Sequence, residues 1–172
     1  AVYLTDPTQM ADPGQAFRQN PHKRVKVDLV HQAVGPVYGA VSAAQPDEDA
    51  EQSFGRAHYE QHMHVTGTLR IGDDTYEIDG YGLRDHSWGP RYWQNILSYR
   101  WLTCSFGPDL NIMVSEIQRT PTDRTEWGVV IRDGKLERVT NVKIDSAFDA
   151  EQPFHRAMTA DVTLDGGEVV RV

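Results

Sequence analysis

One short segment of the chain, Gly80–Arg91, concentrates residue types that can do chemistry. It reads Gly-Tyr-Gly-Leu-Arg-Asp-His-Ser-Trp-Gly-Pro-Arg. A carboxylate beside an imidazole can accept or deliver a proton near neutral pH, so we predict Asp85 and His86 as proton-transfer residues. Guanidinium groups hold carboxylates through paired hydrogen bonds, and we therefore expect Arg84 and Arg91 to orient them.

Aromatic residues near this segment are expected to form the wall of a ligand site. Trp88, Trp93 and Trp101 can supply apolar surface, and their rings can stabilise a cation. A serine hydrolase is disfavoured, because residues adjacent on a strand point to opposite faces and the chain has no Gly-x-Ser-x-Gly elbow.

A long hairpin positions this segment. Apolar residues alternate with polar ones through Ala57–Ile71, a turn is predicted at Gly72–Thr75, and Tyr76–Leu83 returns as the second strand. Matching the apolar faces across that turn fixes the register. The predicted pairs are Arg70 with Glu77, Leu69 with Ile78, and His62 with Asp85.

The polar face of the predicted hairpin carries the remaining candidates. Glu60 and Tyr81 would be the auxiliaries nearest to Asp85, and His62 and His64 would contact the ligand. These five side chains share one face if no bulge intervenes at the hairpin glycines.

A metal site at this face is the alternative that the histidines raise. His62 and His64 are about 6.6 Å apart by strand rise, with Glu60, His58 or Asp85 available as a third ligand. Histidines on a polar strand face are more often exposed or hydrogen-bonded, so we predict no metal and no other cofactor.

The rest of the chain indicates strands joined by hairpins. Crossover helices are missing, so we predict an all-β, antiparallel barrel or half-barrel with very little helix. The one helical segment expected is Pro90–Leu97. The other predicted strands are Val25–Leu29, Arg100–Phe106, Asn111–Ile117, Glu126–Ile131, Leu136–Ile144 and Phe154–Leu164.

Two segments lack this β pattern. Residues 1–24 have no sustained apolar period and are predicted to be a linker or an arm, which leaves 25–172 as the β domain. Residues 42–56 are acidic and rich in small residues, which is typical of an exposed loop.

Composition limits the partners. The 172 residues include 25 acidic and 17 basic ones, giving a net charge of −8, so nucleic acid is disfavoured and a small, largely uncharged ligand is favoured. No apolar stretch is long enough for a membrane span, and no secretory signal is visible, so cytoplasm is the predicted location. The single cysteine, Cys104, is expected in the core.

Three motifs resemble those of known proteins: His58-Tyr-Glu-Gln61, Val65-Thr-Gly-Thr68 and the Gly80–Arg91 segment. Together they resemble an uncharacterised bacterial family of lipocalin-like proteins. They are more distantly similar to the superfamily of carotenoid 1,2-hydratases (hydroxyneurosporene synthases) and AttH-type proteins. The resemblance implies a lipocalin-like β domain that forms the C-terminal half of a two-domain protein, with a preceding β domain as partner.

The same resemblance implies a hydrophobic ligand, such as an isoprenoid, a lipid or a polyketide-like molecule. Acid-initiated hydration, cyclisation or isomerisation would follow, with Asp85 and His86 moving the proton. Two alternatives stay open: a non-catalytic carrier, and a structural module in which a buried Arg/Asp/His cluster caps the turn and fixes an interface. Asp85 or His86 lining an apolar pocket favours an enzyme, whereas burial away from any pocket favours the structural module.

Overall fold

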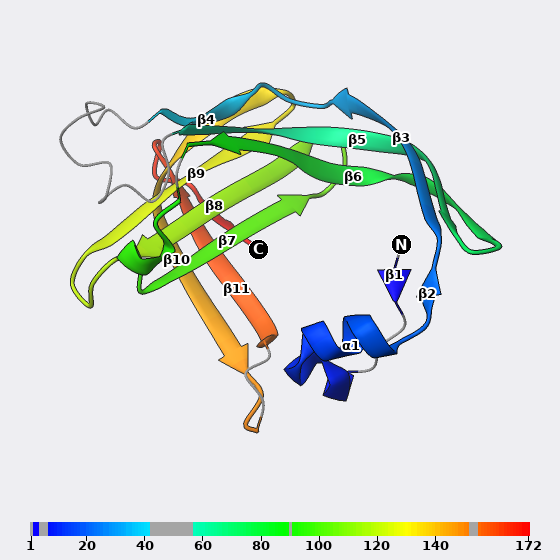
Figure 1. Cartoon of the computed structure of the whole chain (residues 1–172). Helices are drawn as coiled ribbons and strands as arrows, with labels where there is room; N and C mark the ends of the chain where they lie inside the picture. The colour runs from blue at the N-terminus through cyan, green and yellow to red at the C-terminus, as the bar shows by residue number, and fades with distance from the viewer. Residues whose placement is uncertain (1, 4–6, 42–56, 90, 152–154) are drawn as a thin grey trace. The chain divides into compact units, whose positions relative to one another are not determined.

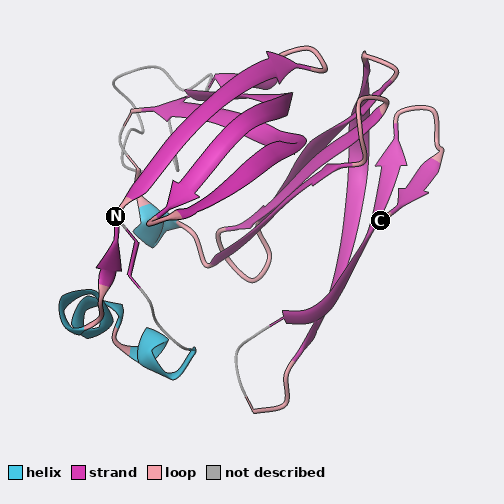
Figure 2. Ribbon diagram, turned by 90° about the vertical axis from the view of Figure 1, so that its right-hand side faces the viewer, coloured by secondary structure: helices cyan, strands magenta, loops and turns pink. Residues whose placement is uncertain are grey.

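Strands make up most of the chain in the computed structural model (Figure 2). The structure describes residues 2–3, 7–41, 57–89, 91–151 and 155–172, so the acidic segment predicted as an exposed loop lies outside the described residues. The chain divides into two compact units, residues 1–32 with 64–80 and residues 33–63 with 81–172. No helix in the described ranges is long and apolar enough to span a membrane.

The elements follow in chain order. The first are β1 (Val2–Tyr3), the 3-10 helix η1 (Pro7–Ala11), α1 (Pro13–Gln19), β2 (His22–Lys23), β3 (Val25–Ala33) and β4 (Tyr38–Val41). The hairpin β5 (Ala57–Ile71) and β6 (Asp74–Trp88) is followed by η2 (Trp93–Asn95). The last are β7 (Ser98–Ser105), β8 (Leu110–Gln118), β9 (Arg124–Arg132), β10 (Lys135–Phe148), β11 (His155–Leu164) and β12 (Val169–Arg171). The predicted all-β, lipocalin-like class is confirmed.

The helices are not where the sequence pattern placed them. The predicted helix at Pro90–Leu97 is only the short 3-10 turn η2, and the α-helix α1 lies in the segment predicted to be a linker or an arm. Local signals stabilise α1: Pro13 occupies its first turn, and the Asp12 side chain accepts a hydrogen bond from the Gln15 amide at 2.8 Å. Only Ala16 of α1 is buried, so no apolar period marks the helix.

β5 is the central strand of a four-stranded sheet, with β3 and β4 along one edge and β6 on the other. The turn between β5 and β6 contains only Gly72 and Asp73, and Gly72 has the positive φ of 62° that such a turn requires. The predicted register assumed a four-residue turn and is wrong. A two-residue turn places Ile71 opposite Asp74, which shifts every predicted partner by two residues while leaving each side chain on its predicted face.

The second large sheet has six strands in the order β12-β11-β10-β9-β8-β7, so each strand pairs with its neighbour in sequence. The predicted turn at Asp133-Gly134 is confirmed as a two-residue turn between β9 and β10. Both residues have positive φ, 51° and 72°, as in the turns whose twist suits antiparallel strands.

The six-stranded sheet bends at β10. Its register shifts between Val139 and Asn141, and β10 and β11 cross β7 and β8 at a steep angle (Figure 1). Past the shift, side chains bond the backbone of β10. Glu126 accepts from the Val142 amide at 3.0 Å, and Arg100 donates to the Ile144 carbonyl at 3.0 Å.

Alternation along the strands separates two cores in the larger unit. One face of β8 and β9 contributes Ile112, Val114 and Val130 to an apolar cluster completed by β10 and β11. The opposite face contributes Met113 and Ile131 to a second cluster with Tyr38, Val129, Leu83 and Trp127. We call the first the inner face of the sheet and the second its outer face.

Candidate functional site

Three titratable residues of β5 occupy alternate positions and hence one face of the strand: His58, Glu60 and His62. Glu60 is 4% exposed and His62 is fully buried. Trp127 of β9 packs on the His58 ring, with 5.5 Å between centroids, so this face of β5 meets the outer face of the six-stranded sheet.

Tyr38 covers Glu60 from the neighbouring strand. The two residues are directly opposite in the antiparallel pairing of β4 and β5, and Tyr38 is 6% exposed. The close approach requires glycine next in β4, because a Cβ at Gly39 would lie 2.3 Å from the His58 carbonyl oxygen. The Tyr38 hydroxyl and Glu60 Oε2 are both buried, the hydroxyl acts on the Glu60 carboxylate as a hydrogen-bond donor, and neither atom has a closer partner among the described residues.

The fold moves the pKa of Glu60 close to neutral pH, where a carboxyl group can both donate and accept a proton. Burial raises its pKa to about 7, the charge of Asp85 adds to the rise, and Tyr38 opposes it more weakly. Burial also raises the pKa of Tyr38, so its hydroxyl stays protonated. Near pH 7 the buried Glu60 carboxyl is therefore protonated for about half of the time. We call Glu60 and the exposed Asp85, whose charge acts on it, the Glu60–Asp85 carboxyl pair.

His58 lies beside the same pair. Its Nε2 is 3.8 Å from Glu60 Oε1. Burial lowers the pKa of His58, the charge of Asp85 opposes this, and the charge of Arg91 lowers the pKa further. His58 is therefore a neutral imidazole that can accept a proton.

His62 is a neutral, fixed member of the cluster. Its Nδ1 lies 3.0 Å from the Ser105 hydroxyl of β7, and its ring is 5.8 Å from that of Tyr38. Burial lowers its pKa to about 4. The charges that Asp85 influences are those of His58 and Glu60, which fits the two-residue turn rather than the predicted pairing of His62 with Asp85.

The other half of the Arg-Asp-His-Ser-Trp motif faces the opposite way. Arg84 donates a 2.7 Å hydrogen bond to the Tyr59 hydroxyl and lies 5.1 Å from the centre of its ring. His86 stacks on Tyr59 at 5.2 Å, and Trp88 contacts both rings, at 5.6 Å from His86 and 6.3 Å from Tyr59. Asp85 and His86, predicted as joint proton-transfer residues, thus interact with different sets of neighbours.

The remaining predicted residues have other contacts. His64 belongs to the smaller unit, where its Nε2 lies 2.6 Å from Asp79 Oδ1. Trp93 contacts Tyr99, with 5.7 Å between ring centroids. Tyr81 is exposed on β6 and Trp101 is exposed on β7. Within the described ranges, no three His, Cys, Asp or Glu side chains come together closely enough to hold a metal ion.

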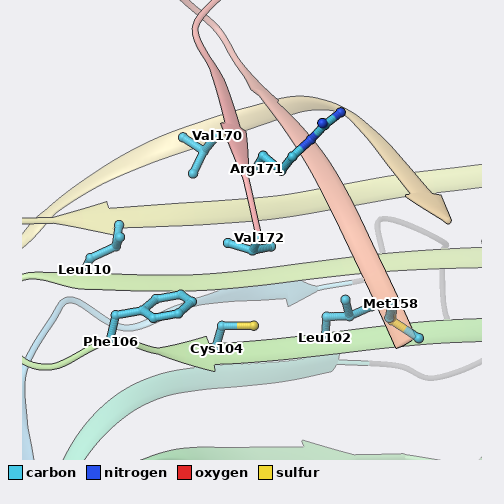
Figure 3. A pocket seen from close by; sticks show the side chains of 8 residues that line it. All are labelled: Leu102, Cys104, Phe106, Leu110, Met158, Val170, Arg171 and Val172. Atoms are coloured by element: carbon cyan, nitrogen blue, oxygen red, sulfur yellow. The ribbon is translucent and has the colours of Figure 1, made fainter. Parts of the chain in front are cut away.

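A cavity of about 480 Å³ lies elsewhere, on the inner face of the six-stranded sheet (Figure 3). Its lining residues come from β7, the start of β8, β11 and the C-terminal β12 segment: Leu102, Cys104, Phe106, Leu110, Met158, Val170, Arg171 and Val172. Asp85 and His86 are absent from this lining, and both are exposed rather than buried. An enzyme was expected to have Asp85 or His86 in the lining of an apolar pocket, and a structural module was expected to have them buried. The structure shows neither arrangement.

Sequence reasoning underestimated two residues and missed two. Glu60 was expected as an auxiliary and His58 only as a metal ligand, although the alternation of His58, Glu60 and His62 was visible. Tyr38 and Trp127 were not identified, because they reach the cluster through pairing and packing between distant segments.

Comparison with known proteins gives one match. The family model described as Domain of unknown function (DUF7064) matches residues 4–172. No curated protein matches the chain. No solved structure matches it either.

Proposed function

Because the chain belongs to the DUF7064 family, a domain family of unknown function, its activity has to be argued from its own residues. We propose that it binds a hydrophobic small molecule beside the Glu60–Asp85 carboxyl pair and protonates it. The supporting observation is a buried carboxylic acid, Glu60, held next to an exposed carboxylate, Asp85. Two carboxyl groups in different environments are the usual arrangement for acid–base work at neutral pH.

The protonation state of the carboxyl pair suits a reaction that begins with proton donation. Near pH 7 Glu60 carries the proton for about half of the time, and Asp85 is the member that a bound molecule can reach. In the proposed reaction Glu60 passes its proton to Asp85, and Asp85 delivers it to the bound molecule. Transfer of the proton to an alkene carbon forms a C–H bond and leaves a cation on the neighbouring carbon. Water or a second double bond then attacks the cation, and a proton returns to the carboxylate, so the reaction is a hydration, a cyclisation or an isomerisation.

Neighbouring groups support the same chemistry. The Trp127 ring beside His58 offers a π-face toward a developing cation. Neutral His58 can accept the proton released when water adds and pass it on to the neighbouring Glu60 carboxylate. On the opposite face of the hairpin, Arg84, His86 and Trp88 hold the strand around Asp85 through Tyr59, so we assign them a positioning role.

The test is deuterium transfer to carbon. Unsaturated isoprenoids are incubated with the protein in D₂O and analysed by mass spectrometry, because each of the three reactions places solvent deuterium on carbon. We expect incorporation by the native chain, and a loss of about 10²–10⁴-fold in Glu60→Gln and Asp85→Asn. Glu77→Gln, an exposed carboxyl of the same strand, is the matched control and should keep full activity.

Other outcomes point to the alternatives. A bound isoprenoid that gains no deuterium identifies a non-catalytic carrier. If neither binding nor incorporation occurs and both variants lose stability, the cluster is structural. The buried, tightly packed Tyr38 and His62 are the observation that favours this structural role.

We also propose that the chain pairs with a preceding β domain and that it is located in the cytoplasm. The exposed rings of Trp88 and His86 are the surface on β6 where such a domain could pack.

A further inference from the structure

We propose that the cavity on the inner face of the six-stranded sheet is a second binding site, for an uncharged apolar small molecule. It goes beyond the acid chemistry proposed above, because no residue of the Glu60–Asp85 site lines it.

The size and lining of the cavity suit a small molecule. Its volume of about 480 Å³ falls within the range of small-molecule sites. All lining residues other than Arg171 have apolar or thiol side chains, and most of these are only half-buried, so apolar surface remains available to a ligand. Figure 3 shows Leu102 and Cys104 of β7 on the side facing Val172.

The charge of the cavity defines the ligand class. Strand alternation turns Val170 and Val172 toward the inner core and Arg171 away from it, and Arg171 bonds Asp161 at 2.5 Å and 2.8 Å. Burial raises the pKa of the Cys104 thiol, which is therefore uncharged. The charged group of the lining, the Arg171 guanidinium, is already paired with Asp161, so a charged ligand would lose its hydration here for little gain, whereas an uncharged ligand would not.

One polar group lies close to the cavity. Ser146 is directly opposite Met158, a lining residue, in the pairing of β10 and β11, so both side chains share a face. The Ser146 hydroxyl is buried and has no hydrogen-bond partner among the described residues. Ser146 is not among the lining residues, so its hydroxyl does not restrict the ligand to an alcohol or a ketone.

The two sites lie on opposite faces of the same strand. Cys104 lines the cavity, and the next residue, Ser105, bonds His62 of the acid cluster. A change that fills one site therefore leaves the other accessible.

Binding is tested with two uncharged probes and a charged one. Nile red should gain fluorescence on binding, the alcohol farnesol should displace it, and oleate should displace it at least tenfold less effectively. Because Cys104 is the single cysteine of the chain, its alkylation by iodoacetamide reports directly on the cavity. Farnesol should slow that alkylation at least fivefold.

Variants assign the binding to this cavity. Cys104→Phe fills it and should abolish Nile red binding, and Leu102→Phe is the second filling variant if the first does not fold. Thr103→Phe, an exposed position between them that faces the other way, is the matched control and should bind like the native chain. Glu60→Gln should also bind normally, which separates this site from the acid site.

Three results would overturn the assignment. They are no Nile red binding by the folded native chain, binding that survives both filling variants, and oleate displacing the probe as well as farnesol does.

Discussion

The inner and outer faces of β7–β9 are built from alternating residues of the same strands, yet they enclose opposite kinds of interior. The inner face is apolar through Ile112, Val114 and Val130 and opens into the cavity. The outer face packs against a cluster in which Tyr38, Glu60 and His62 are buried, and each has a polar atom with no close hydrogen-bond partner in the described part of the chain. Because adjacent residues of a strand point to opposite faces, one face of the sheet carries the apolar cavity and the other contacts the titratable cluster.

The largest effect should follow from making the inner face polar. Val130 is fully buried in the apolar cluster, so Val130→Asn loses apolar burial and introduces an amide without partners. We expect a loss of about 3–5 kcal/mol in the free energy of unfolding by urea. Leu136→Asn, exposed on β10, is the control and should change it by less than about 0.5 kcal/mol. A cost below about 1 kcal/mol at Val130 would contradict the contrast between the faces.

At the outer face a substitution should instead increase stability, because there the cost comes from ionising the buried Glu60 carboxyl. The folded chain keeps Glu60 protonated up to a pKa of about 7, whereas the unfolded chain ionises it near 4.5. Between these values the folded state binds more protons, so this group's contribution to stability falls as pH rises, by about 3 kcal/mol in total. His62, with a pKa of about 4 instead of 6.5, contributes stability that is lost as pH falls through that window.

The two contributions therefore nearly cancel in the native chain between pH 4.5 and 6.5. Glu60→Gln should remove one of them. The melting temperature of this variant should rise as the pH is raised from about 4 to 6.5. At pH 8 its free energy of unfolding should exceed that of the native chain by about 2–3 kcal/mol. Thermal melts across this range, with Glu77→Gln as control, are the measurement. An unchanged pH profile would show that Glu60 ionises normally.

The smallest effect should come from the exposed side of the hairpin. Arg84→Lys keeps the charge but loses the planar contact and hydrogen bond to Tyr59, and these are worth about 0.5–1 kcal/mol at an exposed position. Melting experiments should show this small loss and no change in pH dependence. A loss comparable with that of Val130→Asn would mean that the Tyr59 cluster is covered in solution.

The strands could be predicted because period-two alternation is a local signal, and the sequences of β5, β7 and β11 follow it. The register of β5 and β6 could not, since Gly72-Asp73-Asp74-Thr75 allows a turn of two residues or four. The helix α1 was missed because a single buried residue, Ala16, leaves no helical period.

The site was predicted in part for a related reason. Glu60 and Asp85 were expected to share one face of the hairpin, but the burial of Glu60 depends on Tyr38 and Trp127 from other strands. A polar residue on an alternating strand is expected to be exposed, and only long-range packing reverses that.

The sequential strand order of the six-stranded sheet has a consequence for how the chain folds. Pairing each strand with its neighbour in sequence requires only short loops to close, so β7–β12 can assemble early. The acid cluster needs β4, β5, β6 and β9 in place, and β4 and β5 are separated by residues 42–56. During refolding we therefore expect the apolar cavity to form before the carboxyl pair, so that the chain acquires its capacity to hold a ligand before its capacity to protonate one.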